Sequence, residues 1–255
     1  MSVVVLTSAS GSPGVTTTTL GLACTWNREV IAVEADPTGG STMMAGFFGG
    51  FVCPTQSIVD LGLAHRSGTM AQQFPQSLVP LEGTGVSVLP GPRSHAQAHH
   101  AHQLWEPLHQ LWCATTDTDV LVDAGRLGME HSPTNLLELA DLVLLVTRSD
   151  LVSLAAAKQW ADRAQETHLA HPESAVWKVI LVHPGHPYSA HEVSDVLGLE
   201  VVSCLPHDPG GARHYSHGAP KRPRARINTS LVSAGQKVRD TLSTTHRLHT
   251  PGEKS

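Results

Sequence analysis

Short apolar runs rich in β-branched residues alternate with helical segments along this chain, and this alternation constrains its fold most. The predicted strands are residues 3–7, 30–33, 86–89, 120–122, 142–146, 179–182 and 201–205. The predicted helices between and after them are residues 16–26, 57–65, 96–114, 151–167 and 227–242. Strands separated by helices are joined by right-handed crossovers, so we expect an α/β fold: a mostly parallel sheet flanked by helices on both faces.

The composition agrees with a buried parallel sheet. Hydrophobic residues make up 40% of the chain and aromatic residues 4%, so the core must consist of Val, Leu, Ile and Ala. A chain of 255 residues is long enough for one large α/β domain. We expect a single domain over residues 1–245 and a flexible polar tail over 246–255.

Cysteine usage and the N-terminus indicate a cytoplasmic protein. The four cysteines, Cys24, Cys53, Cys113 and Cys204, are far apart and form no CxxC pair, which argues against a disulfide scaffold. The first residues have no basic segment typical of a signal peptide. No apolar stretch approaches the 18 residues or so that a membrane span needs.

Four loops follow predicted strands, at residues 8–16, 34–40, 123–128 and 206–211. In parallel sheets ligands bind beyond the carboxyl ends of the strands, so these loops should gather at one edge. The first loop has the elements of a phosphate-binding loop: Gly11 and Gly14 for close backbone approach, and Thr16 as a hydroxyl for Mg²⁺ at the start of a helix.

On these residues the chain resembles the MinD/ParA family of deviant Walker-A ATPases, which are SIMIBI-class P-loop NTPases with a loop of the form KGGxGK[TS]T. The resemblance implies that ATP phosphates are bound by residues at the matching positions: Gly11, Ser12, Gly14, Val15, Thr16 and Thr17. The signature lysine of the family falls on Ser10 and the general P-loop lysine on Val15. The chain is therefore similar to a divergent member that lacks both lysines.

Later motifs extend the resemblance over most of residues 1–245. Glu34 and Asp36 match the acidic positions after the family's second strand, and Asp123 matches the end of its Walker-B strand. The resemblance implies catalytic roles for Asp36 and Asp123, and a Mg²⁺ site formed by Thr16, Asp36 and Asp123. It also implies that Pro206 and Asp208, in the stretch CLPHDPGGA, lie against the nucleotide base.

The missing lysines should weaken the site. A charge-assisted hydrogen bond contributes roughly 1.5–3 kcal/mol, or about 10- to 150-fold in affinity. Loss of a preorganised donor costs about another 10²–10³ in rate, and Pro13 removes one backbone N–H from the loop. Arg126, close after Asp123, is the candidate for a substitute cation, the alternative being a solvent-facing loop arginine.

Two further groups of residues suggest binding. His95, His99 and His102 would lie on one helical face and could hold a divalent metal, although a solvated helix face is the plainer interpretation. Residues 1–211 contain 8 basic against 20 acidic residues, and residues 212–255 contain 9 against 2. Lys221, Arg222, Arg224 and Arg226 could contact DNA or an anionic membrane, or could belong to a solvated segment.

The leading hypothesis is a degenerate MinD/ParA-like protein that acts as a positioning, partition or pilus/secretion-assembly factor, with weak or no nucleotide hydrolysis. It implies a protein partner in such a system, a homodimer, and a cytoplasmic location or a peripheral one at the membrane or nucleoid. One alternative is an active, Mg-ATP-dependent dimerising ATPase. The other is a DNA- or membrane-surface binder that acts through the basic C-terminal segment.

Overall fold

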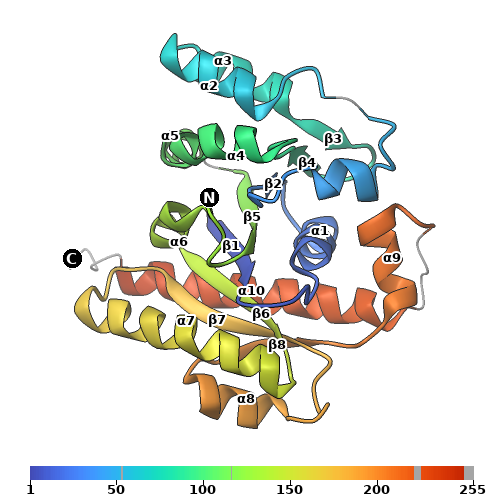
Figure 1. Ribbon diagram of the computed structural model, residues 1–255, viewed down its shortest axis with the longest axis vertical. Coiled ribbons are helices and arrows are strands. Elements are labelled where there is room, and N and C mark those ends of the chain that lie inside the picture. The colour runs from blue at the N-terminus through green and yellow to red at the C-terminus, as the bar shows by residue number, and fades with distance from the viewer. Residues whose placement is uncertain (53, 116, 221–224, 250–255) are drawn as a thin grey trace, which may run out of the picture.

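A sheet of eight strands runs through the computed structural model (Figure 1), which describes residues 1–52, 54–115, 117–220 and 225–249, apart from the side chains of residues 246–249. Along the sheet the strand order is β3-β4-β2-β5-β1-β6-β7-β8, and every pair is parallel except β3 with β4. The strands are β1 (Val3–Ser8), β2 (Val30–Glu34), β3 (Val79–Leu81), β4 (Val86–Leu89), β5 (Asp119–Arg126), β6 (Leu142–Arg148), β7 (Val176–Val182) and β8 (Val201–Leu205).

Helices connect these strands. They are α1 (Val15–Thr25), α2 (Ile58–Arg66), α3 (Met70–Gln73), α4 (His95–Ala101), α5 (Trp105–Cys113), α6 (Thr134–Leu139), α7 (Leu151–Ala170), α8 (Ala190–Leu197), α9 (Pro209–His217) and α10 (Arg226–His249). A π-helical turn, η1 (Met43–Phe47), and two 3₁₀ turns, η2 (Phe74–Ser77) and η3 (His102–Leu104), complete the list for the described residues.

The two faces of the sheet are covered by different helices, because successive strand residues point to opposite sides. Val4 and Leu6 of β1 pack in the cluster that includes α1, α9 and α10. Val3 and Val5 pack on the other face, in the cluster that includes α2, α5 and α6, while α7 and α8 cover β6–β8. The expected α/β fold with helices on both faces is confirmed.

The predicted strands all form, with boundary differences that matter for the site. Asp123 was expected at the end of its strand, but β5 continues to Arg126, because Ser8 and Arg126 still pair across a local shift in register. The expected helix over 96–114 is divided into α4, η3 and α5. The expected loop 206–211 is shortened, because Asp208 caps α9 by accepting a hydrogen bond from the Gly211 N–H at 3.0 Å.

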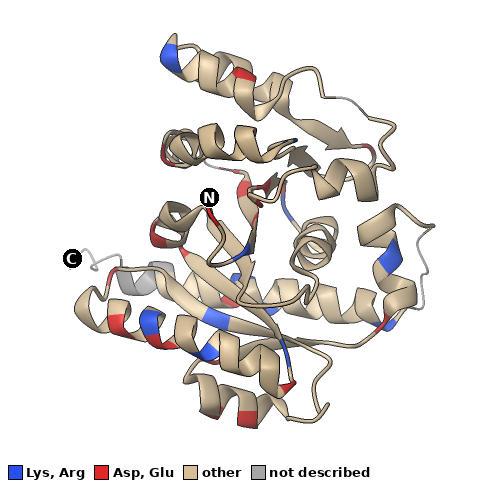
Figure 2. Ribbon diagram, viewed as in Figure 1, with Lys and Arg blue, Asp and Glu red and all other residues tan. Residues whose placement is uncertain are grey.

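The last helix, α10, packs on the sheet. Its buried residues recur at helical spacing and lie in the same cluster as α1: Ile227, Leu231, Ala234, Val238 and Leu242. Gly21 of α1 leaves the room for this contact, since a Cβ there would lie 2.6 Å from a Leu231 methyl. The apolar face of α10 thus belongs to the core. Lys and Arg residues, blue in Figure 2, occur along both α9 and α10.

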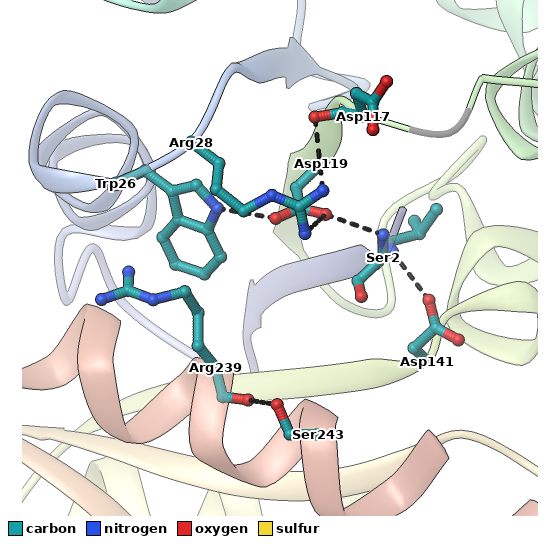
Figure 3. A network of polar contacts seen from close by, with 9 residues as sticks. Ser2, Trp26, Arg28, Asp117, Asp119, Asp141, Arg239 and Ser243 are labelled. Atoms are coloured by element: carbon teal, nitrogen blue, oxygen red, sulfur yellow. Dashed lines mark hydrogen bonds and ion pairs between the residues drawn. The ribbon is translucent and has the colours of Figure 1, made fainter. Parts of the chain in front are cut away.

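A polar network ties the amino end of the sheet together (Figure 3). The buried Asp119 carboxylate accepts hydrogen bonds from the Ser2 N–H and the Trp26 indole N–H, both at 3.0 Å, and forms an ion pair with Arg28 at 3.7 Å. The Arg239 guanidinium of α10 lies 5.0 Å from the centroid of the Trp26 ring. One carboxylate thereby links β5, the N-terminus and the end of α1.

Among the described residues, no helix is both long and apolar enough to cross a membrane.

Candidate nucleotide site

The carboxyl ends of β2, β5 and β1 lie side by side and bring three of the predicted site residues together. In the register of the sheet, Asp123 is opposite Leu6 of β1 on one side and Glu34 of β2 on the other. Asp36 follows Glu34 by two residues, and Thr16 lies in the first turn of the helix that follows β1. The Thr16 hydroxyl and the Asp36 carboxylate both affect the pKa of Asp123, so these side chains are close neighbours.

The loop between β1 and α1 has the backbone expected of a phosphate-binding loop. Gly11 and Gly14 have φ angles of +62° and +101°, which favour glycine. The first bond of α1 runs from the Thr18 N–H to the Gly14 carbonyl at 2.8 Å, and no side chain caps the helix. The N–H groups of residues 15–17 therefore have no acceptor within the helix, which is the arrangement that binds anions.

The two lysine positions contain side chains that cannot supply a positive charge. Val15 is 7% exposed and packs in the core with Leu20 and Tyr215, so its side chain does not face the loop. Ser10 is half-buried. Any contribution of Val15 to phosphate binding comes from its backbone N–H.

Asp123 has the electrostatics of a cation ligand. Its side chain is fully buried, and its Oδ1 atom accepts a hydrogen bond from the Gly125 N–H at 3.0 Å. Burial raises the pKa of this carboxyl to about 7, the Thr16 hydroxyl lowers it, and the Glu34 carboxylate raises it further. The Thr16 hydroxyl is near enough to lower the pKa of this carboxyl. Even so, the Oδ2 atom accepts no hydrogen bond that meets ordinary distance and angle limits among the described residues. An unsatisfied carboxylate oxygen beside a hydroxyl fits the oxygen ligands that Mg²⁺ prefers.

Asp36 lies close to Asp123, and its side chain is held by its own turn. Its Oδ1 atom accepts hydrogen bonds from the N–H and the hydroxyl of Thr38, at 2.9 and 2.8 Å. The carboxylate rests directly over Gly125, where an added Cβ would collide with it. Gly125 also has a φ of +62°. The close approach of β5 to Asp36 therefore depends on this glycine.

Glu34, the other acidic residue of this motif, has a structural role. It is 2% exposed and accepts hydrogen bonds from the Ser41 hydroxyl at 2.6 Å and from the N–H groups of Met43 and Gly91, both at 3.1 Å. Burial raises the pKa of this carboxyl, and these three donors oppose the rise. Glu34 thus fastens η1 and the loop after β4 to the end of β2.

Arg148 is the arginine that reaches the phosphate-binding loop, and the sequence analysis did not identify it. It ends β6, the neighbour of β1, and its Nη2 atom donates a hydrogen bond to the Ser12 carbonyl at 3.0 Å. Arg126 ends β5 and is exposed, and within the described part of the chain its guanidinium has no hydrogen bond or ion pair. The signal that could have identified Arg148 is its position two residues after the predicted strand 142–146.

The loop after β8 places a different set of groups at the same edge. The Asp208 carboxylate accepts hydrogen bonds from the Gly211 N–H and, at 3.3 Å, from the Ile227 N–H. These hydrogen bonds lower the pKa of Asp208. Pro206 precedes it, and the His207 ring lies 4.8 Å from that of His183. A role of Pro206 and Asp208 at the nucleotide base stays a prediction.

Of the predicted basic surface, Arg226 lies within the described residues, at the start of α10. Lys221, Arg222 and Arg224 lie outside them.

A glycine-containing loop between the central strand and the first helix, with Thr16 and Asp123 beside it, defines an α/β fold of the P-loop type. No protein-family model matches the sequence, and no curated protein matches it. Solved structures do match the fold. The septum site-determining protein MinD of Pyrococcus horikoshii OT3, complexed with Mg-ADP, has a TM-score of 0.74 at 16% identity, over 96% of this chain and 98% of that chain.

Two further solved structures have the same fold as this chain. MinD in the MinC:MinD cell division complex of Aquifex aeolicus has a TM-score of 0.72 at 17% identity, over 100% of this chain and 99% of that chain. A ParA family ATPase from Chlorobium tepidum TLS has a TM-score of 0.72 at 16% identity, over 92% of this chain and 97% of that chain. The chain therefore has the fold of the MinD/ParA ATPases over nearly its whole length.

Proposed function

We propose that this chain is a MinD/ParA-like positioning, partition or pilus/secretion-assembly factor that binds Mg-nucleotide and hydrolyses it very slowly or not at all. The observation that carries this proposal is a contrast within one site. Thr16, Asp36 and Asp123 are brought together beside an uncapped helix start, whereas Ser10 and Val15 stand where the two lysines would be.

The residues present fit a Mg-nucleotide. The free N–H groups of residues 15–17 would hold phosphate oxygens, with Gly11, Ser12 and Gly14 allowing close approach. The Thr16 hydroxyl, Asp123 and Asp36 would hold the ion, directly or through water. When bound, the ion neutralises phosphate charge. Pro206 and Asp208 would border the base.

Turnover should suffer more than binding. Each missing lysine removes a charge-assisted contact of roughly 1.5–3 kcal/mol to the phosphates. Hydrolysis also needs donors aimed at charge that develops in the transition state, and loss of one costs about 10²–10³ in rate. The backbone donors and the three oxygen ligands remain, so binding survives these losses better than catalysis.

A second candidate function is a working ATPase that dimerises around Mg-ATP. The observation that favours it is the Arg148–Ser12 hydrogen bond, which holds a guanidinium at the loop. Rotation of this exposed side chain would bring its charge to bound phosphates and substitute for a lysine. Hydrolysis would then depend on Arg148.

Phosphate release from ATP at saturating Mg²⁺ separates the two functions. The variants are Arg148→Ala, Asp36→Ala and, as the matched control, Arg126→Ala, which removes the exposed arginine at the end of the adjacent strand β5. The leading proposal predicts that the unmodified protein releases little or no more phosphate than Asp36→Ala. Turnover that is lost in Arg148→Ala and Asp36→Ala but kept in Arg126→Ala would contradict it and establish the ATPase.

We also propose a protein partner and a nucleotide-dependent homodimer, in the cytoplasm or at the periphery of the membrane or nucleoid. The Aquifex aeolicus MinD fold match, solved with MinC, supports a partner of this kind. Lys221, Arg222, Arg224 and Arg226 would provide contact with DNA or anionic lipid.

The surface role of these four residues is tested without deleting α10, because that helix fills the core. Their joint replacement by glutamine should reduce salt-sensitive binding to DNA or to anionic vesicles and leave the thermal melt unchanged. Equal retention of both proteins on both surfaces would exclude the basic segment as the contact.

A further inference from the structure

A cluster of histidine and glutamate side chains lies beside the nucleotide site, between the start of α4 and the turn that follows β5. The His131 Nε2 atom is 3.5 Å from one Glu130 carboxylate oxygen, and the His95 Nε2 atom is 3.9 Å from the other. One ligand atom from each of the three residues falls within 4.8 Å of the other two. The His99 ring packs on the His131 ring with centroids 4.7 Å apart.

Local structure brings these residues together from distant parts of the sequence. Ser94 caps α4 by accepting a hydrogen bond from the Gln97 N–H at 3.3 Å, so His95 starts the helix and His99 lies one turn later. On the other side, the Ser132 hydroxyl donates to the Met129 carbonyl at 2.8 Å and fixes the turn. His131 adopts a φ of +65° within this turn and points its ring at His95.

We propose that His95, Glu130 and His131 form a binding site for Zn²⁺ or a chemically similar first-row divalent ion, with water in the fourth position. Two imidazoles and one carboxylate are a ligand set that Zn²⁺ takes in proteins. Tetrahedral Zn²⁺ with bonds of about 2.0–2.1 Å places its ligand atoms about 3.4 Å apart. The 3.5 Å separation between His131 Nε2 and Glu130 Oε1 is close to that value. His95 Nε2 lies 3.9 Å from the other carboxylate oxygen, Oε2, so the exposed His95 and Glu130 side chains must rotate for all three residues to bind one ion.

The chemistry distinguishes this site from the predicted Mg²⁺ site. Mg²⁺ prefers oxygen ligands and binds through carboxylates and phosphates, whereas imidazole nitrogen favours zinc, copper and nickel. The spacing of His95, His99 and His102 predicted that these three side chains share one helical face. In the structure His102 belongs to η3, and the partners of His95 come from another loop.

Bound metal would join two loops that border the nucleotide site. The His95 helix starts at Ser94, whose backbone packs against Gly39 in the loop that carries Asp36; a Cβ on Gly39 would lie 3.0 Å from the Ser94 carbonyl carbon. Glu130 and His131 follow the strand that carries Asp123. The metal would therefore restrain both loops whether or not nucleotide is bound.

Calorimetric titration of the metal-stripped full chain with ZnCl₂, and separately with MgCl₂, tests the site. We expect one equivalent of Zn²⁺ to bind with micromolar affinity and Mg²⁺ not to displace it. His131→Ala and His95→Ala should each weaken binding by at least about 10-fold, since even outer-shell substitutions cost 10–100-fold. The matched control His168→Ala removes an exposed histidine of α7 and should change nothing.

Two results would overturn the proposal. One is an unmodified protein that binds no stoichiometric Zn²⁺ below millimolar concentration. The other is tight binding that persists in His131→Ala but disappears in Cys113→Ser, which would assign the metal to the Cys113–His109 pair on α5, whose sulfur and ring nitrogen atoms are 3.7 Å apart. Circular dichroism of each variant is the control for folding: retained helical signal means that a loss of binding is not caused by a loss of fold.

Discussion

At the residue scale, the Asp123 carboxylate is completely buried, and its Oδ2 atom accepts no hydrogen bond from the described residues. Sequence reasoning placed Asp123, Asp36 and Thr16 at one sheet edge, because the order of strands and loops determines that edge. It matched both Glu34 and Asp36 to the acidic motif and gave the site role to Asp36 alone, but it predicted no structural role for Glu34. Glu34 is structural because its buried carboxylate accepts hydrogen bonds from Ser41, Met43 and Gly91. No sequence motif marks these three donors.

Asp123 should make the stability of the protein depend on pH. Its pKa is raised to about 7 from 3.8, so between these values the folded state binds a proton that the unfolded state has lost, and stability falls as pH rises. Asp123→Asn removes this dependence and keeps an acceptor for Gly125. Relative to the unmodified protein, the variant should gain about 2–4 kcal/mol in unfolding free energy between pH 4 and pH 8. Urea denaturation at a series of pH values measures this difference, and a difference that is constant with pH would contradict the assigned burial.

Gly125 provides a second test at this scale. Gly125→Ala should lower the free energy of unfolding by about 1–2 kcal/mol because of the positive φ at this position. The collision of the added Cβ with Asp36 should lower it further. Gly68→Ala is the matched control, because Gly68 has a φ of +71° and nothing within 4 Å of an added Cβ. Urea denaturation should give a larger loss for Gly125→Ala. Equal losses would mean that Asp36 does not rest on Gly125.

At the element scale, predicted strands matched well, because each is a continuous apolar run buried on both faces. The shortest described strand, β3, was not predicted. It contains Pro80 and pairs antiparallel at the edge of the sheet, and neither its composition nor its spacing indicates a strand. Helix α9 is rich in glycine and histidine, so its intrinsic helix propensity is low. The Asp208 cap and the burial of Tyr215 stabilise it instead.

The Asp119 network should stabilise the junction between α1, β5 and the N-terminus (Figure 3). Asp119→Asn removes the acceptor of the Trp26 indole or of the Ser2 N–H and the charge opposite Arg28, and should destabilise the fold by about 1–3 kcal/mol. Glu166→Gln, the same charge change at an exposed position of α7, should cost less than about 0.5 kcal/mol. Thermal and urea denaturation measure both, and equal costs would show that the network contributes nothing.

At the scale of the whole molecule, the fold follows from the alternation of strand and helix, and the site follows from the topology. The sequence alone predicted the phosphate-binding loop, the two aspartates beside it and the absence of both lysines, and the structure places these residues at one edge of the sheet. Sequence reasoning missed Arg148, because its contact with Ser12 joins residues that are neighbours only once β1 and β6 pair. It also missed Glu130 and His131 as partners of His95, since an irregular turn brings them together.

The central claim is that this site retains Mg-dependent nucleotide binding without lysines. Calorimetric titration of the full chain with ATP and with ADP, each with and without Mg²⁺, tests it most directly, with Asp123→Ala as the site variant and Arg126→Ala as the matched control. The account predicts micromolar binding that requires Mg²⁺, is lost in Asp123→Ala and is kept in Arg126→Ala. The absence of any heat of binding up to millimolar nucleotide, or binding that needs neither Mg²⁺ nor Asp123, would contradict it.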